Sequence, residues 1–199
     1  MVNFAVVPER TALVNIDMQN LFVEGAPTGH ETLGRINRLA AACREAGILV
    51  IHTSHVLRPD GSNMGVLGEV APPVKDGLLN KGAETAALHK ELVVDPRDVL
   101  LDKPRYGAFY GTDLELILRA RGIETIIISG ISTTTCCDTT AREAMARDFR
   151  VLFLSDGTAT SQAELHEATL KIIGARFAQV LTVDEMIMKV NGAGHTSAS

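Results

Sequence analysis

Short runs of apolar, β-branched residues alternate along most of this chain with longer segments of helical period. The runs predict strands at residues 11–16, 48–53, 99–101, 125–129, 151–154 and 180–181. The segments between them predict helices at residues 31–46, 84–92, 113–121, 135–147, 162–174 and 183–190, with the weakest pattern at 84–92. Gly47 and Gly122 follow two of these helices, at positions where glycine commonly ends a helix. Residues 55–82 are rich in glycine and proline without a clear period, which indicates a long surface excursion.

Strands that are apolar throughout, with helices between them, are typical of a parallel sheet covered on both faces. The pattern therefore predicts a single α/β domain over residues 1–199, with a small, polar tail at 191–199 that we expect to fray. Ligands of such sheets bind at the carboxyl ends of the strands. Asp17, Lys103 and the loop at Gly130 each follow such an end.

Composition narrows the class of protein. The chain has 199 residues, 46% of them hydrophobic, and a formal net charge of -5. Charges of both signs are interspersed without a basic, aromatic-rich stripe, which argues against nucleic acid as a partner. We expect no membrane partner, because no apolar run approaches the roughly 18–20 residues that span a bilayer. The N-terminal sequence does not resemble a signal peptide, and three cysteines do not suit a disulfide framework, so a cytoplasmic protein with reduced thiols is expected.

The strongest chemical signal is the segment GISTTTCC at residues 130–137, which runs from a buried strand into a helix. This position puts Cys136 in the first turn, where unpaired N–H groups and the helix dipole favour a thiolate. A small buried hydrophobe is the alternative for Cys136. Cys137 lies about 100° further around the helix and is expected to pack into the core.

Asp17 and Lys103 are each ambiguous alone. A carboxylate after a buried strand either caps a loop or serves as a partly desolvated base, and most lysines are solvated. A thiol nucleophile needs a base for its proton and a cation for the thiolate, so the three residues together fit an activated nucleophile better than any one of them does. The sequence does not show that they meet.

Three segments in this order resemble the signature segments of the isochorismatase-like cysteine hydrolases: DMQNLF at 17–22, KPRYGAF at 103–109 and GISTTTCCDTTAREA at 130–144. The likeness extends over residues 10–190. It implies a three-layer α-β-α fold around a mainly parallel six-stranded sheet, and a catalytic triad of Asp17, Lys103 and Cys136. It also implies a cis peptide between Ile131 and Ser132, with an oxyanion hole formed by the backbone N–H groups of Ser132 and Cys136.

By the same resemblance, Asp17 takes the thiol proton, Cys136 attacks an amide carbon, ammonia leaves, and water hydrolyses the thioester. Isochorismatases, which cleave an enol ether, typically lack the cysteine, so its presence favours a C–N bond of a small amide, ureido or N-carbamoyl compound. Nicotinamidases carry an Asp-x-His metal site after the second strand, where this chain has IHTSH at 51–55. His52 and His55 are three apart, but a third ligand is absent nearby, so we expect no metal and no other cofactor.

The expected substrate contacts lie in or beside these segments: Gln19, Phe22, His55, Arg105, Tyr106, Phe109 and Ile131. Arg105 could receive a substrate carboxylate or be a surface arginine, and Phe22 and Phe109 could instead anchor loops. The run at 133–135 could bind substrate or cap the following helix. The remaining histidines, His30, His89, His166 and His195, are expected at the surface.

Other functions stay open. The chain could be a nicotinamidase-like or ether-cleaving hydrolase of the same fold, or a non-catalytic binding member. A thiol redox protein is disfavoured, because adjacent cysteines in a helix form a disulfide only with strain. The resemblance also implies a homo-oligomer acting on a small molecule.

Overall fold

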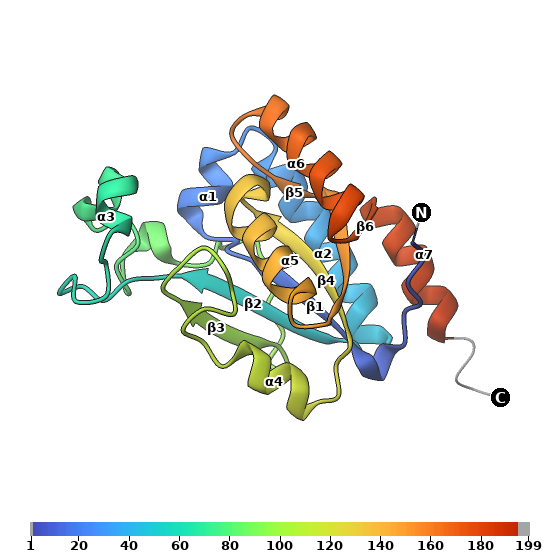
Figure 1. Cartoon of the computed structure of the whole chain (residues 1–199). Coiled ribbons are helices and arrows are strands. Elements are labelled where there is room, and N and C mark those ends of the chain that lie inside the picture. Colours follow the sequence, from blue (N-terminus) through green and yellow to red (C-terminus); the bar gives the residue numbers. More distant parts are fainter. Residues whose placement is uncertain (1, 195–199) are drawn as a thin grey trace.

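Six parallel strands form one sheet in the computed structural model, which describes residues 2–194 (Figure 1). The strands are β1 Thr11–Ile16, β2 Leu49–His55, β3 Val99–Lys103, β4 Thr125–Ile131, β5 Arg150–Ala159 and β6 Gln179–Leu181. Their spatial order is β3-β2-β1-β4-β5-β6, and each neighbouring pair is parallel. The predicted strands all occur, most of them extended by one or two residues beyond the apolar run.

Helices cover both faces of this sheet (Figure 1). They are α1 Asn20–Gly25, α2 Gly29–Glu45, α3 Leu67–Val70, α4 Leu114–Ala120, α5 Asp138–Met145, α6 Ala163–Arg176 and α7 Val183–Gly194. Leu13 and Leu152 share a core with α2 and α7, whereas Val14 and Phe153 share the opposite core with α4, α5 and α6. Successive strand residues point to opposite faces, so strands that are apolar throughout fill both cores. The predicted three-layer α/β architecture is confirmed.

Two predicted helices differ from the structure. Residues 84–92 contain only the 3₁₀ turn η3, Glu84–Ala86, because backbone groups nearby pair with the segment after β1: Asn20 donates to Ala87 and His89 donates to Met18. The helix predicted at 135–147 begins instead with the π turn η4, Thr133–Cys137, and continues as α5. Helix α1 was not predicted, since six residues are too few to show a helical period.

Between β2 and β3 the chain makes the predicted excursion, with only short helical turns: α3, Pro72–Asp76 (η2) and η3. Helix α3 stands out from the body of the molecule in Figure 1. Gly47 and Gly122 have positive φ angles after α2 and α4, as their role in ending helices requires.

At the other end of the chain, α7 extends to Gly194 and so includes the first residues of the expected tail, and residues 195–199 lie outside the described part. Within residues 2–194, no helix has both the length and the apolar character that a membrane crossing requires.

Candidate active site

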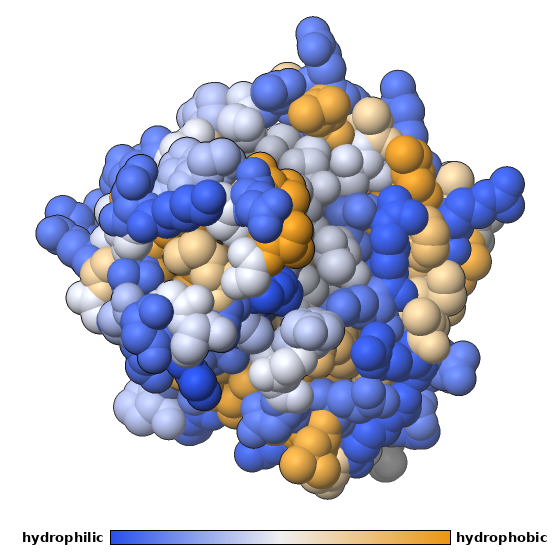
Figure 2. Space-filling view, turned by 60° about the vertical axis from the view of Figure 1, so that its left-hand side comes forward, coloured by the Kyte–Doolittle hydropathy of each residue, from blue (hydrophilic) through white to orange (hydrophobic). Residues whose placement is uncertain are grey.

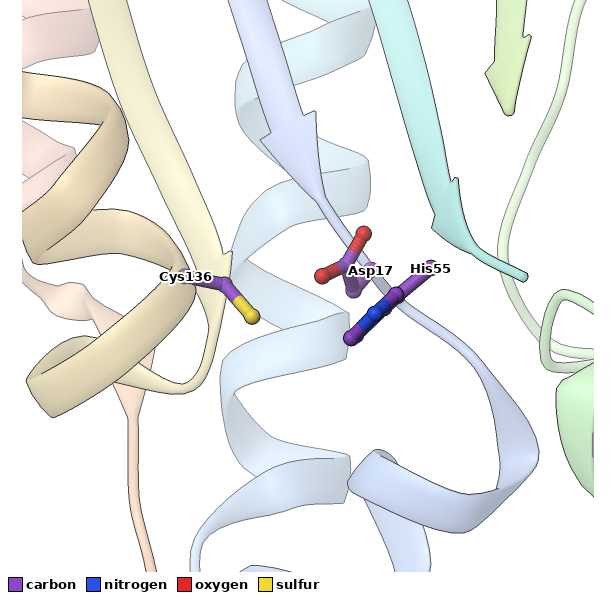
Figure 3. Close-up of side chains that lie close together, drawn as sticks. All are labelled: Asp17, His55 and Cys136. Atoms are coloured by element: carbon purple, nitrogen blue, oxygen red, sulfur yellow. The ribbon is translucent and has the colours of Figure 1, made fainter. Parts of the chain in front are cut away.

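The carboxyl ends of three parallel strands bring the three predicted catalytic residues together. Asp17 follows β1, Lys103 ends β3 and Cys136 lies in η4 after β4. Lys103 Nζ lies 2.7 Å from Asp17 Oδ2. The Asp17 carboxylate, the Cys136 thiol and a ring nitrogen of His55 lie within 4.8 Å of one another, and Figure 3 shows these three side chains pointing toward a common space.

The backbone at Asp17 is held in an unusual conformation. Its φ is +49°, a region that non-glycine residues rarely adopt and that is enriched at functional sites. The Asp17 N–H donates to the carbonyl and to the hydroxyl of Thr53, and the Thr53 hydroxyl donates to Asp17 Oδ1 over 2.6 Å. Thr53 therefore orients the carboxylate, a role that sequence analysis missed; the signal was a polar residue on β2 at the level of Asp17.

Asp17 Oδ2 lies 2.7 Å from Lys103 Nζ, and within residues 2–194 it has no partner besides this ion pair. A carboxylate oxygen can accept a second hydrogen bond. Oδ2 therefore has an acceptor position free for the thiol proton of Cys136.

The Lys103 ammonium is fully buried and lies between three oxygen acceptors. It donates to the carbonyls of Arg105 and Tyr106, both at 2.9 Å, and faces Asp17. Burial pulls the Lys103 pKa down, but the charge of Asp17, and that of Cys136 once it ionises, outweigh burial and raise the pKa above its ordinary value. Lys103 is therefore charged, and it acts on Cys136 through its field, since its donors already have partners.

The turn that carries Cys136 depends on close backbone packing. Gly130 has φ +119°, and a Cβ there would lie 2.0 Å from the Ile16 carbonyl oxygen, so only glycine fits. The expected cis peptide between Ile131 and Ser132 is present. The Ser132 carbonyl then accepts hydrogen bonds from the N–H groups of Thr135 and Cys137, which closes the π turn around Cys136.

Burial decides the resting state of the nucleophile. It raises the Cys136 pKa to about 12; Lys103 lowers this pKa, and Asp17 raises it further. The thiol is therefore protonated at neutral pH, which differs from the thiolate expected from its place in the first turn. A base has to accept its proton before the sulfur can form a bond to carbon.

Residues beside Cys136 hold the turn in place. Cys137 is fully buried in the core, as predicted, with its Sγ 3.9 Å from the Ser129 carbonyl. The Thr140 hydroxyl donates to the Cys136 carbonyl and accepts from the Ala108 N–H. Thr140 thereby links the nucleophile turn to the loop that follows Lys103.

Two predicted substrate contacts have structural partners instead. The Gln19 amide bonds both the N–H and the carbonyl of His55 and also the Ala86 carbonyl, so it clamps the end of β2. Phe109 is buried in the core against Phe149, with the Arg147 guanidinium over its ring, and anchors its loop.

The other predicted contacts lie closer to the reacting groups. Tyr106 packs edge-on against His55, with ring centroids 5.8 Å apart. Ile131 is buried in a cluster that Phe22 partly covers. The Arg105 guanidinium donates to the carbonyls of Asn63 and Pro104, which ties it to the excursion.

The remaining histidines have several different environments. His30 is exposed, as predicted, but His89 is buried with its Nε2 3.2 Å from Glu24, and the partly buried His166 ring contacts the Thr133 hydroxyl. The surface prediction is thus wrong for His89, which Glu24 and the segment after β1 cover, whereas His166 is partly exposed. His195 lies outside the described residues.

The structure offers poor support for a metal at this site. His52 and His55 lie on opposite faces of β2, so they cannot share an ion. Asp17, His55 and Cys136 are close enough to do so, but the Lys103 ammonium occupies the side of Asp17 that a cation would need. The residues present therefore fit a charged lysine better than a metal ion.

Access to the reacting groups is narrow, since Cys136 is only 3% exposed. A cavity of about 380 Å³ is lined in part by Arg105, Tyr106 and the exposed Val66 and Val70 of the excursion. Figure 2 shows the side of the molecule that carries the excursion as mostly hydrophilic, with separate apolar patches. Tyr106 belongs both to this cavity and to the surroundings of His55.

Comparisons with known proteins agree with this geometry. The isochorismatase domain model matches residues 11–185. The chain is 34% identical to ureidoacrylate amidohydrolase RutB of Methylorubrum extorquens, over 88% of this chain and 80% of that one, and 36% identical to nicotinamidase 3 of Arabidopsis thaliana, over 88% and 86%. The crystal structure of a cysteine hydrolase from Pseudomonas syringae pv. phaseolicola superposes with a TM-score of 0.90 at 33% identity, covering 96% of this chain and 97% of that one. The chain belongs to the isochorismatase family.

Proposed function

We propose that this protein is a cysteine amidohydrolase that cleaves the C–N bond of a small amide, ureido or N-carbamoyl compound. The observation that carries the proposal is a buried Asp17–Lys103 ion pair whose carboxylate lies within 4.8 Å of the protonated Cys136 thiol. Its relatives include an enzyme named for ureidoacrylate and a cysteine hydrolase.

The arrangement supports a mechanism in which Asp17 moves one proton back and forth. Asp17 Oδ2 accepts the thiol proton as Cys136 Sγ attacks the carbonyl carbon. The positive charge of Lys103 stabilises the negative charge that develops on the sulfur. The tetrahedral intermediate collapses as Asp17 returns the proton to the nitrogen, which leaves as ammonia. Asp17 then takes a proton from water, whose oxygen attacks the thioester carbon, and it returns that proton to the Cys136 sulfur as the C–S bond breaks.

The negative oxygen of the tetrahedral intermediate needs hydrogen-bond donors, and these lie on the side of the carbon away from Asp17. We assign this role to the backbone N–H groups of Ser132 and Cys136, because Ser132 caps the π turn η4 and Cys136 lies within it. One such donor is typically worth about 10²- to 10³-fold in kcat. Tyr106, Phe22 and Ile131 are the side chains we assign to the pocket wall, with Arg105 at its entrance.

Substrate size and assembly follow from the same site. The enclosed nucleophile favours a small molecule as partner, without a metal or other cofactor. We further propose that the protein works in the cytoplasm as a homo-oligomer in which a second copy covers the exposed Val66 and Val70 beside the entrance.

Ammonia release tests the proposal. Wild type and Cys136→Ala would be assayed on a panel of ureido acids, N-carbamoyl amino acids and primary amides, with and without chelator. We expect release that withstands chelator and disappears in the variant. Release that survives Cys136→Ala would exclude Cys136 as nucleophile.

A second candidate is a nicotinamidase-like activity, favoured by the 36% identity to nicotinamidase 3. Including nicotinamide in the same panel separates the two functions. Turnover of nicotinamide that stops on metal removal and returns with added Zn²⁺ or Fe²⁺ would support this candidate.

A further inference from the structure

His55 is a buried side chain beside the reacting groups that the proposed mechanism does not use. It ends β2, is 1% exposed, and has a ring nitrogen within 4.8 Å of both the Asp17 carboxylate and the Cys136 thiol (Figure 3). Gln19 clamps its backbone on both sides, and Tyr106 packs against its ring. The imidazole is therefore held in one orientation.

The two ring nitrogens of His55 have different surroundings. The ring hydrogen-bonds the Pro104 carbonyl, whereas Nε2 is buried and has no partner in the described part of the chain. Burial, together with the charge of Lys103, lowers the His55 pKa to about 4, so the ring is neutral at physiological pH. A carbonyl only accepts hydrogen bonds, so the one ring proton is on Nδ1. Nε2 is then an unpaired acceptor.

The donors close to His55 are already engaged. The Lys103 ammonium faces two carbonyls and Asp17, and in the proposed mechanism the Cys136 thiol proton goes to Asp17. An unpaired buried acceptor is unfavourable. A bound ligand that carries an N–H or O–H group is the remaining source of a hydrogen bond for Nε2.

We infer that His55 Nε2 accepts a hydrogen bond from the leaving –NH₂ of the substrate and thereby selects unsubstituted amide or ureido groups over esters of the same acyl group. The inference rests on the proposed amidohydrolase function. With the carbonyl oxygen at the Ser132 and Cys136 N–H groups, the nitrogen faces Asp17, and His55 lies on that side. An ester alkoxy group offers no N–H and leaves Nε2 unpaired, which is how polar sites reject such analogues.

The test compares an amide with the methyl ester of the same acid. The amide is the panel compound that wild type hydrolyses in a Cys136-dependent way. The ester is followed by its hydrolysis or, if it is not turned over, by its inhibition constant against the amide. His55→Leu removes the acceptor, His55→Gln places an amide oxygen near the position of Nε2, and His30→Gln is a surface control.

We expect His55→Leu to lower kcat/KM for the amide by about 10- to 100-fold and to change the ester value by less than about 3-fold. His55→Gln should recover most of the amide activity, and His30→Gln should match wild type. Equal losses for amide and ester in His55→Leu would overturn the inference, as would a His55→Gln variant that folds normally and is as impaired as His55→Leu. If wild type releases no ammonia from any panel compound, the proposed function fails first, which is a separate outcome.

Discussion

Strand β2 carries two buried histidines, and they differ in whether both ring nitrogens have hydrogen-bond partners. His52 is fully paired: one ring nitrogen contacts Asp98 at 3.0 Å and the other contacts the Asn15 amide at 3.3 Å. Arg44 also binds Asp98, and Ser129 donates to Asn15, so the cluster is closed. On the opposite face, His55 Nε2 has no hydrogen-bond partner among residues 2–194, and Asp17 Oδ2 has only its ion pair with Lys103.

The difference shows where the molecule has free hydrogen-bonding capacity. A paired polar cluster under a sheet adds specificity and rigidity to the fold. A cluster with unpaired buried atoms is destabilising unless a reactant supplies the missing partners. The His52 cluster is therefore expected to affect stability, and the Asp17–His55 cluster activity.

Removing the acceptor at the reacting side should have the largest effect on activity. Asp17→Asn keeps the shape of the side chain but cannot take the thiol proton, so kcat should fall by about 10²- to 10⁴-fold. Ammonia release measures the loss, and circular dichroism checks that the variant is folded. An Asp17→Asn enzyme with more than a tenth of wild-type kcat would contradict the assigned role.

Breaking the paired cluster should instead reduce stability. Asp98→Asn leaves the buried Arg44 without its carboxylate and weakens the contact with His52, so the free energy of unfolding should drop by about 3–5 kcal/mol. Urea unfolding measures the change, with Asp184→Asn, an exposed partner of Arg38, as the matched control. kcat per folded molecule should stay within about 3-fold of wild type. A loss of kcat with unchanged stability would contradict the structural role of the His52 cluster.

Replacing Thr53 should affect both activity and stability moderately, because its hydroxyl orients Asp17 without taking part in the reaction. Thr53→Val should lower kcat by about 10-fold and stability by about 1–3 kcal/mol, since the variant leaves Asp17 Oδ1 without a donor. Thr53→Ser keeps a hydroxyl and should recover most of the activity. Failure of serine to do so would indicate that the methyl group matters rather than the hydrogen bonds.

The smallest effect should appear as a pH dependence of stability. Burial lowers the His55 pKa from 6.5 to about 4, so on acidification the unfolded chain binds its proton before the folded protein does. Stability should therefore fall as the pH drops from 6.5 to 4, and His55→Gln should make that slope shallower. Unfolding midpoints across this range measure the slope; an unchanged slope in His55→Gln would mean that His55 is not kept neutral by the fold.

The sequence predicted the elements whose signal is local. The apolar run at 11–16 and the glycines at 47 and 122 mark where a strand lies and where helices end, and parallel strands bring their carboxyl ends together. That reasoning, with the family resemblance, identified Asp17, Lys103 and Cys136.

What the sequence did not reveal depends on partners far along the chain. The role of Thr53 depends on its register beside Asp17, and the burial of His89 depends on Glu24 and the segment after β1. The amide of Gln19 is used by the backbone of β2 rather than by a substrate. The raised pKa of Cys136 was also not expected, because it comes mainly from burial by segments far along the chain.

Mass spectrometry of the enzyme quenched during turnover identifies the residue that carries the acyl group, and so tests whether Cys136 is the nucleophile. With an amide that releases ammonia, the account predicts an acyl group joined through a thioester to Cys136, labile to hydroxylamine and missing in Cys136→Ala. Steady turnover with an adduct on a different residue would contradict it, as would turnover that persists in Cys136→Ala.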